Sequence, residues 1–483
     1  MSPESRLPSR LQLPRIPFSD VKWLSAFQPQ RSDPDLRSVP LGFLAFIALG
    51  GALLLTPWAC APGHALAVID AFFLSASAVC VTGLAPVNIS ETLSGFGHGV
   101  ILLLLQLGGL GIVTASLALV MLGGKRLSLA HEGAVAATIG RLQRATPAEL
   151  FRYSCLMVAL CESAGAASLY WRLQALNPAA DPLTLVWQAV FHAVSGFCNA
   201  GFSIFPEGLV AWRGDPVLLG IIDLLVIAGG IGLLSLINLR YYYFWRRDPR
   251  RRGRMALQTK LAAGVTLLLI GAGTGVTLLF EWNHAFSDEA VAQKFSWAVF
   301  HSVMCRTAGF NVVDPGQMHP ATLLSGMVLM FVGGSPGSMA GGIKTVTLAV
   351  LYCAARAALL RQETVEMLGR RISPRAVGIA LMLAMLALAT VLLGIGCLML
   401  TELGEPAAAV TGGWLGLMFE AFSAFGTTGL STGVTSLLTL SGKLVVMALM
   451  FLGRVGPLVL AVYLARPVRP WHIRPPEEEV ALG

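Results

Sequence analysis

Apolar residues form long, nearly charge-free runs along most of the chain. The long runs lie near residues 39–60, 98–122, 149–171, 216–239, 258–281, 318–355, 376–401 and 441–465. Each reaches the roughly 20 residues that a helix needs to cross a hydrocarbon core of about 30 Å. The pattern therefore predicts eight membrane-spanning helices.

Shorter apolar runs lie between the members of each consecutive pair of long runs. They cover residues near 64–80, 182–198, 289–305 and 406–425, and each is followed by a loop that contains glycine. A run this short, or this interrupted by small polar residues, is typical of a helix that enters the membrane without crossing it. The order long, short, loop, long thus occurs four times.

The four loops contain related pentads with a glycine in the same place. The pentads are Cys80-Val81-Thr82-Gly83-Leu84, Cys198-Asn199-Ala200-Gly201-Phe202, Arg306-Thr307-Ala308-Gly309-Phe310 and Gly426-Thr427-Thr428-Gly429-Leu430. Their glycines are 118, 108 and 120 residues apart. This period indicates four parallel copies of one unit around a pseudo-fourfold axis. Glycines that merely permit close helix packing are the alternative, but they would not share one position.

Four such loops on one axis suit a cation. The C-terminal end of a helix carries a partial negative charge, and a ring of backbone carbonyls can replace the hydration shell of a monovalent ion. A divalent site would need carboxylates, which the pentads lack. The predicted filter residues are Val81, Thr82, Gly83, Asn199, Ala200, Gly201, Thr307, Ala308, Gly309, Thr427, Thr428 and Gly429.

Composition and charge fix the class and the orientation. The chain is 55% hydrophobic and only 12% charged, about half the usual charged fraction, which excludes most soluble enzymes. Of its 34 Lys and Arg residues, 27 lie in the two terminal segments and three loops that alternate with the short runs. The positive-inside rule therefore places both termini in the cytoplasm, and the net charge of +8 reports topology rather than a nucleic-acid partner.

This layout divides the chain into four repeats joined by cytoplasmic segments. The repeats cover 38–124, 149–239, 258–355 and 376–466, the linkers 125–148, 240–257 and 356–375, and the cytoplasmic ends 1–37 and 467–483.

The sixth long run is interrupted at 333–342 by residues that cannot hold a regular helix cheaply. They include Gly333, Gly334, Ser335, Pro336, Gly337, Ser338, Gly341 and Gly342. Irregular backbone at membrane depth lines water or is buried in protein, so we expect a flexible plug below the filter rather than a simple kink.

Three basic residues lie inside or beside apolar runs. Lys344 ends the interrupted segment, and either gates or reaches toward the interface. Arg454 lies in the last long run, where it faces a pore or forms a buried ion pair. Arg306 lies within a pentad, and we expect it to turn away and pair with a carboxylate. Asp70, Glu162 and Glu420 are the candidates, and the sequence does not choose among them.

These motifs resemble those of the Trk/Ktr/HKT superfamily of potassium-uptake proteins. The resemblance covers residues 38–466 and includes the segment 331–344 and the late motif Gly453-Arg454-Val455-Gly456-Pro457. Eight spanning helices without an additional leading pair bring the chain nearer the Ktr type. The first two pentads depart from the family pattern at Cys80 and Cys198.

The resemblance implies an all-α polytopic membrane protein with four helix–pore-loop–helix repeats around one central pore. It further implies channel-like, potassium-selective uptake across the bacterial inner membrane, with the segment 333–342 as gate. K⁺ is then cargo, the protein is no enzyme, and its Na⁺ dependence is not fixed by the sequence. The implied partners are the lipid bilayer, a second copy of the chain and a cytoplasmic RCK-type regulatory ring. No P-loop or GxGxxG unit occurs here, so nucleotide would bind that ring.

Two other functions fit the sequence less well. A secondary transporter, such as a cation-coupled symporter, typically has inverted rather than parallel repeats. An intramembrane aspartyl protease would need Asp70 and Asp223 in glycine-flanked positions, but Asp223 lies in Ile-Ile-Asp-Leu-Leu.

Overall fold

The computed structural model describes residues 34–110, 147–233, 235–236, 238–239, 255, 257–409 and 413–456. Within these ranges the helices and loops are accompanied by one hairpin of two strands, β1 (Glu366–Met367) and β2 (Arg370–Arg371). Its turn residues Leu368 and Gly369 both have positive φ, as a tight two-residue hairpin requires. The hairpin lies in the predicted linker 356–375, so the expectation of an entirely helical chain missed it.

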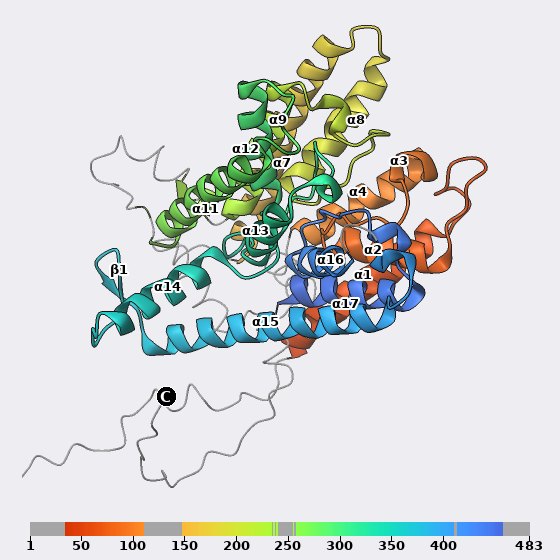
Figure 1. Ribbon diagram of the computed structural model, residues 1–483. Coiled ribbons are helices and arrows are strands. Elements are labelled where there is room, and N and C mark those ends of the chain that lie inside the picture. The colour runs from red at the N-terminus through yellow and green to blue at the C-terminus, as the bar shows by residue number, and fades with distance from the viewer. Residues whose placement is uncertain are drawn as a thin grey trace, which may run out of the picture.

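The helices form four units, which are numbered here in chain order (Figure 1). The first long helix of each unit is α1 (Pro34–Leu54), α7 (Pro147–Leu176), α11 (Leu257–Glu281) or α15 (Pro374–Thr401). The short helix is α2 (Val68–Val79), α8 (Pro182–Phe197), α12 (Val291–Met304) or α16 (Trp414–Gly426). The second long helix is α4 (Gly95–Gly109), α9 (Pro216–Ile231), the pair α13 (Pro320–Phe331) and α14 (Thr345–Leu359), or α17 (Leu440–Val455).

Short helical turns lie in the connections between these helices. They are α3 (Ile89–Thr92) and the 3-10 helices η4 (Val210–Trp212), η6 (Pro315–Gln317), η7 (Pro406–Ala408) and η8 (Thr435–Leu437).

Two described helices are long and apolar enough to cross a membrane by those criteria alone, Leu257–Glu281 and Ala376–Thr401. The predicted run 318–355 is divided between α13 and α14. The runs 98–122 and 441–465 continue beyond the described residues. The segment 1–33, most of the predicted linkers 125–148 and 240–257, and the tail 467–483 also lie outside them.

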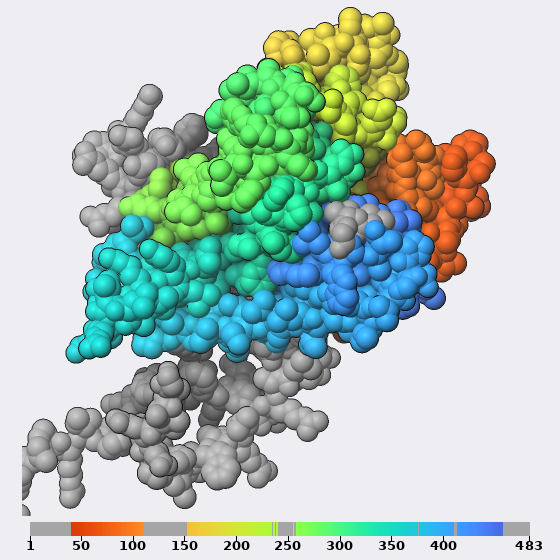
Figure 2. Space-filling view, in the orientation of Figure 1, coloured from red at the N-terminus to blue at the C-terminus, as the bar shows by residue number. Residues whose placement is uncertain are grey.

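Neighbouring units contact one another through a short helix and a second long helix. α4 contacts α8, α9 contacts α12, and α13 contacts α16. The helix α17 of the last unit then contacts α2 of the first. In the surface view, the blue of unit 4 accordingly adjoins the orange of unit 1 (Figure 2). The units therefore follow one another in chain order and close on themselves.

In two units an acidic residue at the end of the first long helix holds the start of the second. Glu281 accepts a hydrogen bond from the backbone N–H of His319 at 2.9 Å, just before α13. Glu402 accepts one from the hydroxyl of Thr439 at 2.6 Å, just before α17. These carboxylates satisfy N–H and O–H groups at a helix start and fix where the chain re-enters the bundle.

Candidate functional site

The loop after each short helix has the same unusual backbone. A non-glycine residue with positive φ is followed two positions later by a glycine with positive φ. The former are Val81 (56°), Asn199 (61°), Thr307 (75°) and Thr427 (50°), and the latter Gly83 (97°), Gly201 (71°), Gly309 (74°) and Gly429 (91°). Left-handed conformations cost energy for side chains with a Cβ and persist only where the surroundings impose them. All four pentad loops, residues 80–84, 198–202, 306–310 and 426–430, thus share one strained shape.

The glycines of the four pentad loops lie against one another in a closed ring. A Cβ added to any of them would clash with a carbonyl oxygen of the next loop. The added Cβ would lie 2.1 Å from Ala200 O at Gly83, 2.4 Å from Ala308 O at Gly201, 2.2 Å from Thr428 O at Gly309, and 2.2 Å from Thr82 O at Gly429. The fourth contact returns to the first loop, so the ring is complete and only glycine fits its four positions.

Serines in the short helices hold three of these loops, and the sequence reasoning missed them. The backbone N–H groups of Gly83 and Gly429 each donate to a serine hydroxyl at 3.1 Å, Ser77 and Ser423 respectively. Ser195 instead donates to Phe202 O at 2.8 Å. Each serine lies six residues before its pentad glycine, and this shared offset is a signal that the sequence did contain.

Unpaired oxygen atoms gather at the ring. The hydroxyls of Thr82, Thr307, Thr427 and Thr428 are buried and have no hydrogen-bond partner among the described residues. An open cavity of about 340 Å³ leads to the glycines of three loops, Gly83, Gly309 and Gly429. Asn311, Asp314, Ser431 and Thr435 also line it. The ring and its entrance are therefore rich in oxygen atoms and hold one carboxylate.

The loop 333–342 docks on the second and fourth units. Ser335 and Met339 donate backbone hydrogen bonds to the carbonyls of Gly230 (2.9 Å) and Gly229 (3.2 Å) in α9. A Cβ on Gly341 would lie 2.2 Å from the Thr427 hydroxyl, so the far end of the loop touches the fourth pentad loop. The loop thus lies directly against the ring.

Arg454 and Lys344 both donate hydrogen bonds to backbone carbonyls of the loop 333–342. Arg454, 6% exposed, donates to Met339 O in the loop and to Gly108 O in α4. Lys344 folds back and donates to Ala340 O at 2.7 Å. For Arg454 the described partners are backbone carbonyls, whereas the ion-pair alternative required a carboxylate.

A second set of glycines, of which only Gly453 was named from the sequence, packs the long helices against the ends of the short ones. A Cβ on Gly108 would lie 2.0 Å from Val79 O, and those on Gly229 and Gly453 would lie 1.9 Å from Phe197 O and Phe425 O. Glycine follows Gly108 and Gly229, but Arg454 follows Gly453. The arginine therefore takes a position that is glycine in two other units.

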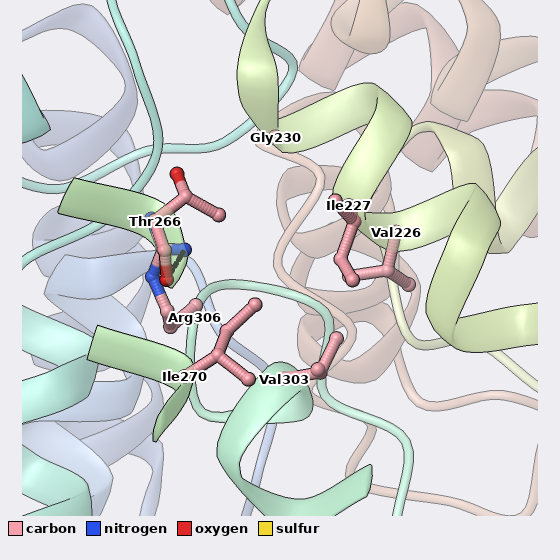
Figure 3. Close-up of a pocket in the computed structure, with 7 residues that line it drawn as sticks. All are labelled: Val226, Ile227, Gly230, Thr266, Ile270, Val303 and Arg306. Carbon is pink, nitrogen blue, oxygen red and sulfur yellow. Dashed lines mark hydrogen bonds between the residues drawn. The ribbon is translucent and has the colours of Figure 1, made fainter. Parts of the chain in front are cut away.

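The prediction that a carboxylate pairs with Arg306 is wrong for all three candidates. Asp70 pairs with Lys443 (2.7 Å), Glu162 binds Gln106 (2.5 Å) and Cys198 (3.8 Å), and Glu420 binds Ser431 (2.9 Å) and Thr435. The Arg306 guanidinium instead donates to the carbonyls of Thr266 (3.4 Å) and Gly333 (3.2 Å), and Figure 3 shows the first bond. Its two Nη atoms thus bind backbone carbonyls, and each of the three candidate carboxylates is bound to other side chains.

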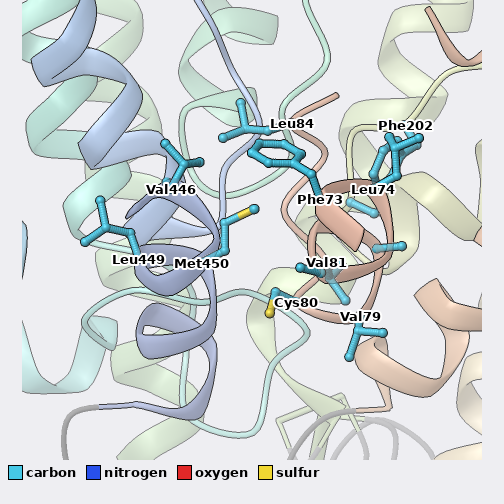
Figure 4. Packing of buried hydrophobic residues seen from close by; sticks show 14 of the residues in the cluster. Phe73, Leu74, Val79, Cys80, Val81, Leu84, Phe202, Val446, Leu449 and Met450 are labelled. Carbon is cyan, nitrogen blue, oxygen red and sulfur yellow. The ribbon is translucent and has the colours of Figure 1, made fainter. Parts of the chain in front are cut away.

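An apolar core supports the ring from behind. Phe73, Cys80 and Leu84 of unit 1 are fully buried and belong to one cluster with Val446 and Met450 of α17 (Figure 4). Such close packing leaves the first pentad loop little room to relax, which is how a strained backbone is maintained.

Comparison with known proteins places the chain in a family. A family model described as cation transport protein, TrkH, matches residues 39–468. The potassium/sodium uptake protein NtpJ of Enterococcus hirae is 33% identical over 92% of this chain and 96% of its own length. The Ktr system potassium uptake protein B of Bacillus subtilis is 33% identical over 96% of this chain and 98% of its own.

The fold also has a counterpart among solved structures. The potassium transporter TrkH from Vibrio parahaemolyticus matches with a TM-score of 0.68 at 18% identity, covering 91% of this chain and 86% of that one. At this identity the match shows the fold, and the family model and the two relatives show the kinship. The resemblance inferred from the pentads and the late Gly-Arg motif is therefore confirmed, and the chain belongs to the TrkH family of cation transport proteins of the membrane.

Proposed function

We propose that this chain is a potassium-selective, channel-like uptake protein of the plasma membrane. Its four units would surround one pore, with the pentad loops as the filter and the loop 333–342 as the gate. The observation that carries the proposal is the closed ring of four glycines and four carbonyls. The names of the relatives from Enterococcus hirae and Bacillus subtilis, both potassium uptake proteins, agree with it.

The ring and its entrance supply the oxygen ligands that a cation needs when it loses its hydration water. The oxygen-lined cavity of about 340 Å³ receives the hydrated ion. Carbonyls of the pentad loops then replace its water, and the C-terminal ends of the four short helices add favourable potential. The unpaired hydroxyls of Thr82, Thr307 and Thr428 offer further oxygen ligands. These ligands are neutral, so they favour a monovalent ion over a divalent one.

The loop 333–342 closes the pathway below the ring in this proposal. It is bound to α9 by backbone hydrogen bonds and to Arg454 and Lys344 by their side chains. The two positive charges also repel a cation that has passed the filter. Opening requires the loop to leave these partners, which a few kcal/mol of regulatory binding energy can achieve.

Orientation and partners follow the same proposal. Both termini would be cytoplasmic, two chains would form a homodimer, and an RCK-type nucleotide-binding ring would control the gate from the cytoplasm. The basic inner segments offer a surface for such a ring. The alternative, a cation-coupled symporter for another monovalent ion or solute, would differ in moving its substrate only together with a coupling cation.

Flux through purified protein tests this function. The full chain is reconstituted into vesicles, and K⁺ and Na⁺ fluxes are measured separately and together, with protein-free vesicles as background. We expect K⁺ flux without Na⁺ and much slower Na⁺ flux alone. Equal fluxes of the two ions would contradict potassium selectivity, and movement of Na⁺ together with K⁺ in a fixed ratio would establish the symporter.

A further inference from the structure

Arg306 lies between the third pentad loop and the loop 333–342. It directly precedes Thr307, whose backbone has a φ of 75°, and it is only 6% exposed. A guanidinium keeps its charge in any environment. A buried arginine without a carboxylate among its described partners is costly, so its position calls for a role beyond packing.

The contacts of Arg306 join the ring to the first residue of that loop. Its Nη2 donates to Gly333 O at 3.2 Å and its Nη1 to Thr266 O in α11 at 3.4 Å. Gly333 itself lies close to the ring, because a Cβ there would stand 3.3 Å from Thr307 Cγ2 and 2.0 Å from Gly341 O. The Arg306 side chain thus fixes both the start of the third pentad loop and the start of the loop 333–342.

The surroundings of the guanidinium leave it able to exchange partners. Arg306 and Thr266 line a cavity of about 10 Å³ between α9, α11 and α12, large enough for roughly one water molecule (Figure 3). Arg306 Nε has no partner among the described residues. Gly230, whose carbonyl binds Ser335 of the loop, lines the same cavity. Release of Gly333 therefore breaks one hydrogen bond rather than an ion pair.

We propose that Arg306 is a positioning residue that couples the gate to the filter. While it binds Gly333, the loop 333–342 is held against the ring and Thr307 keeps its left-handed shape. When the loop 333–342 leaves the ring, the guanidinium loses its hydrogen bond to Gly333 O. The support of the third pentad loop then changes as well. Gate release and filter geometry thereby become one event, an inference that rests on the proposed function.

The test uses Arg306→Lys and Arg306→Gln in the full chain, with Arg361→Gln as the control. Lysine keeps the charge but cannot span two carbonyls as the planar fork does, and Arg361 is exposed. Hydrogen–deuterium exchange of residues 333–345 and the K⁺ to Na⁺ flux ratio are both measured on the inserted fraction. Loss of one charge-assisted hydrogen bond predicts about tenfold faster exchange of that segment.

Coupling requires both measurements to change in both Arg306 variants, with a lower flux ratio accompanying faster exchange, and neither to change in the control. A lower flux ratio with unaltered exchange would overturn the inference, because Arg306 would then support the filter alone. Faster exchange with an unaltered ratio would overturn it too. Wild-type flux is measured alongside, so a failure of the proposed function shows there, whereas exchange of the segment reports on Arg306 independently of transport.

Discussion

Four residues with side chains, one in each pentad loop, adopt a backbone that usually belongs to glycine. The sequence indicated these loops by their shared glycines. Residues such as Val81 and Thr307 were included in the predicted filter only because they neighbour those glycines. Their left-handed shape was not predictable, because nothing in a Val-Thr-Gly or Thr-Ala-Gly triplet demands it. The ring imposes this shape, because each pentad loop packs against the next.

Gly83→Ala tests the ring at its first contact. The new Cβ would lie 2.1 Å from Ala200 O at a φ of 97°, so the first two loops must separate. Strain from the backbone alone is about 1 kcal/mol, and the steric clash adds to it. We expect K⁺ flux in vesicles to be lost or its selectivity over Na⁺ to collapse. Gly271→Ala in α11, where a Cβ meets no atom within 4 Å, is the control and should behave as wild type.

Arg306 shows the limit of residue-level reasoning. The prediction that it pairs with a carboxylate was wrong, because the sequence offered three carboxylates and no way to see that each was already bound. Backbone carbonyls, which every residue carries, leave no trace in a sequence.

Elements are set in place by contacts at their ends. The helix α17 starts where Thr439 binds Glu402, a carboxylate with no exposed surface, at the end of α15. The long apolar runs predicted both helices but not this hydrogen bond, which joins residues 37 positions apart.

Glu402→Ala should weaken this helix start. The hydroxyl and N–H of Thr439 would lose their buried acceptor, which costs about 2 kcal/mol. Thermal unfolding in detergent should show a clear decrease in stability. Glu405→Ala, three residues away and exposed, is the matched control and should change stability by no more than about 0.5 kcal/mol. Equal losses in both variants would refute the role of Glu402.

The interrupted element α13–α14 makes a prediction about gating. Arg454→Gln removes the donors to Met339 O and Gly108 O, so the loop 333–342 should leave the ring more often. A lost charge-assisted hydrogen bond corresponds to about tenfold more basal K⁺ flux per inserted protein. Arg356→Gln, exposed on α14, should leave flux unchanged. Unchanged flux with less folded protein in the Arg454 variant would assign the arginine a purely structural role.

At the scale of the whole molecule, the last unit closes on the first. Lys443 of α17 and Asp70 of α2 are 373 residues apart in sequence, and their side chains pair at 2.7 Å with 14% of each exposed. From the sequence, Asp70 was only a candidate partner for Arg306 or one of the two aspartates that an intramembrane protease would need. That it ties the fourth unit to the first depends on closure of the bundle.

A double-mutant cycle of Asp70→Ala and Lys443→Ala measures this closure. A largely buried pair should give a coupling of about 1 kcal/mol in thermal unfolding. The more exposed pair Arg213 and Glu289, 3.9 Å apart, serves as the comparison and should show little coupling. Similar coupling energies in both pairs would mean that the Asp70–Lys443 pair stabilises the contact between units 4 and 1 no more than the comparison pair stabilises its own surroundings.

The sequence by itself determined the membrane class, the family, the runs that became helices and the positions of the four pentad glycines. These are local properties, written in hydropathy, spacing and motif, and they do not depend on how the units meet. Only the tertiary structure decided what lies against each glycine, which carbonyls hold Arg306 and Arg454, and which backbone groups of α9 bind the loop 333–342. Those outcomes depend on backbone atoms brought together from units about 115 residues apart, and backbone atoms are the same in every sequence.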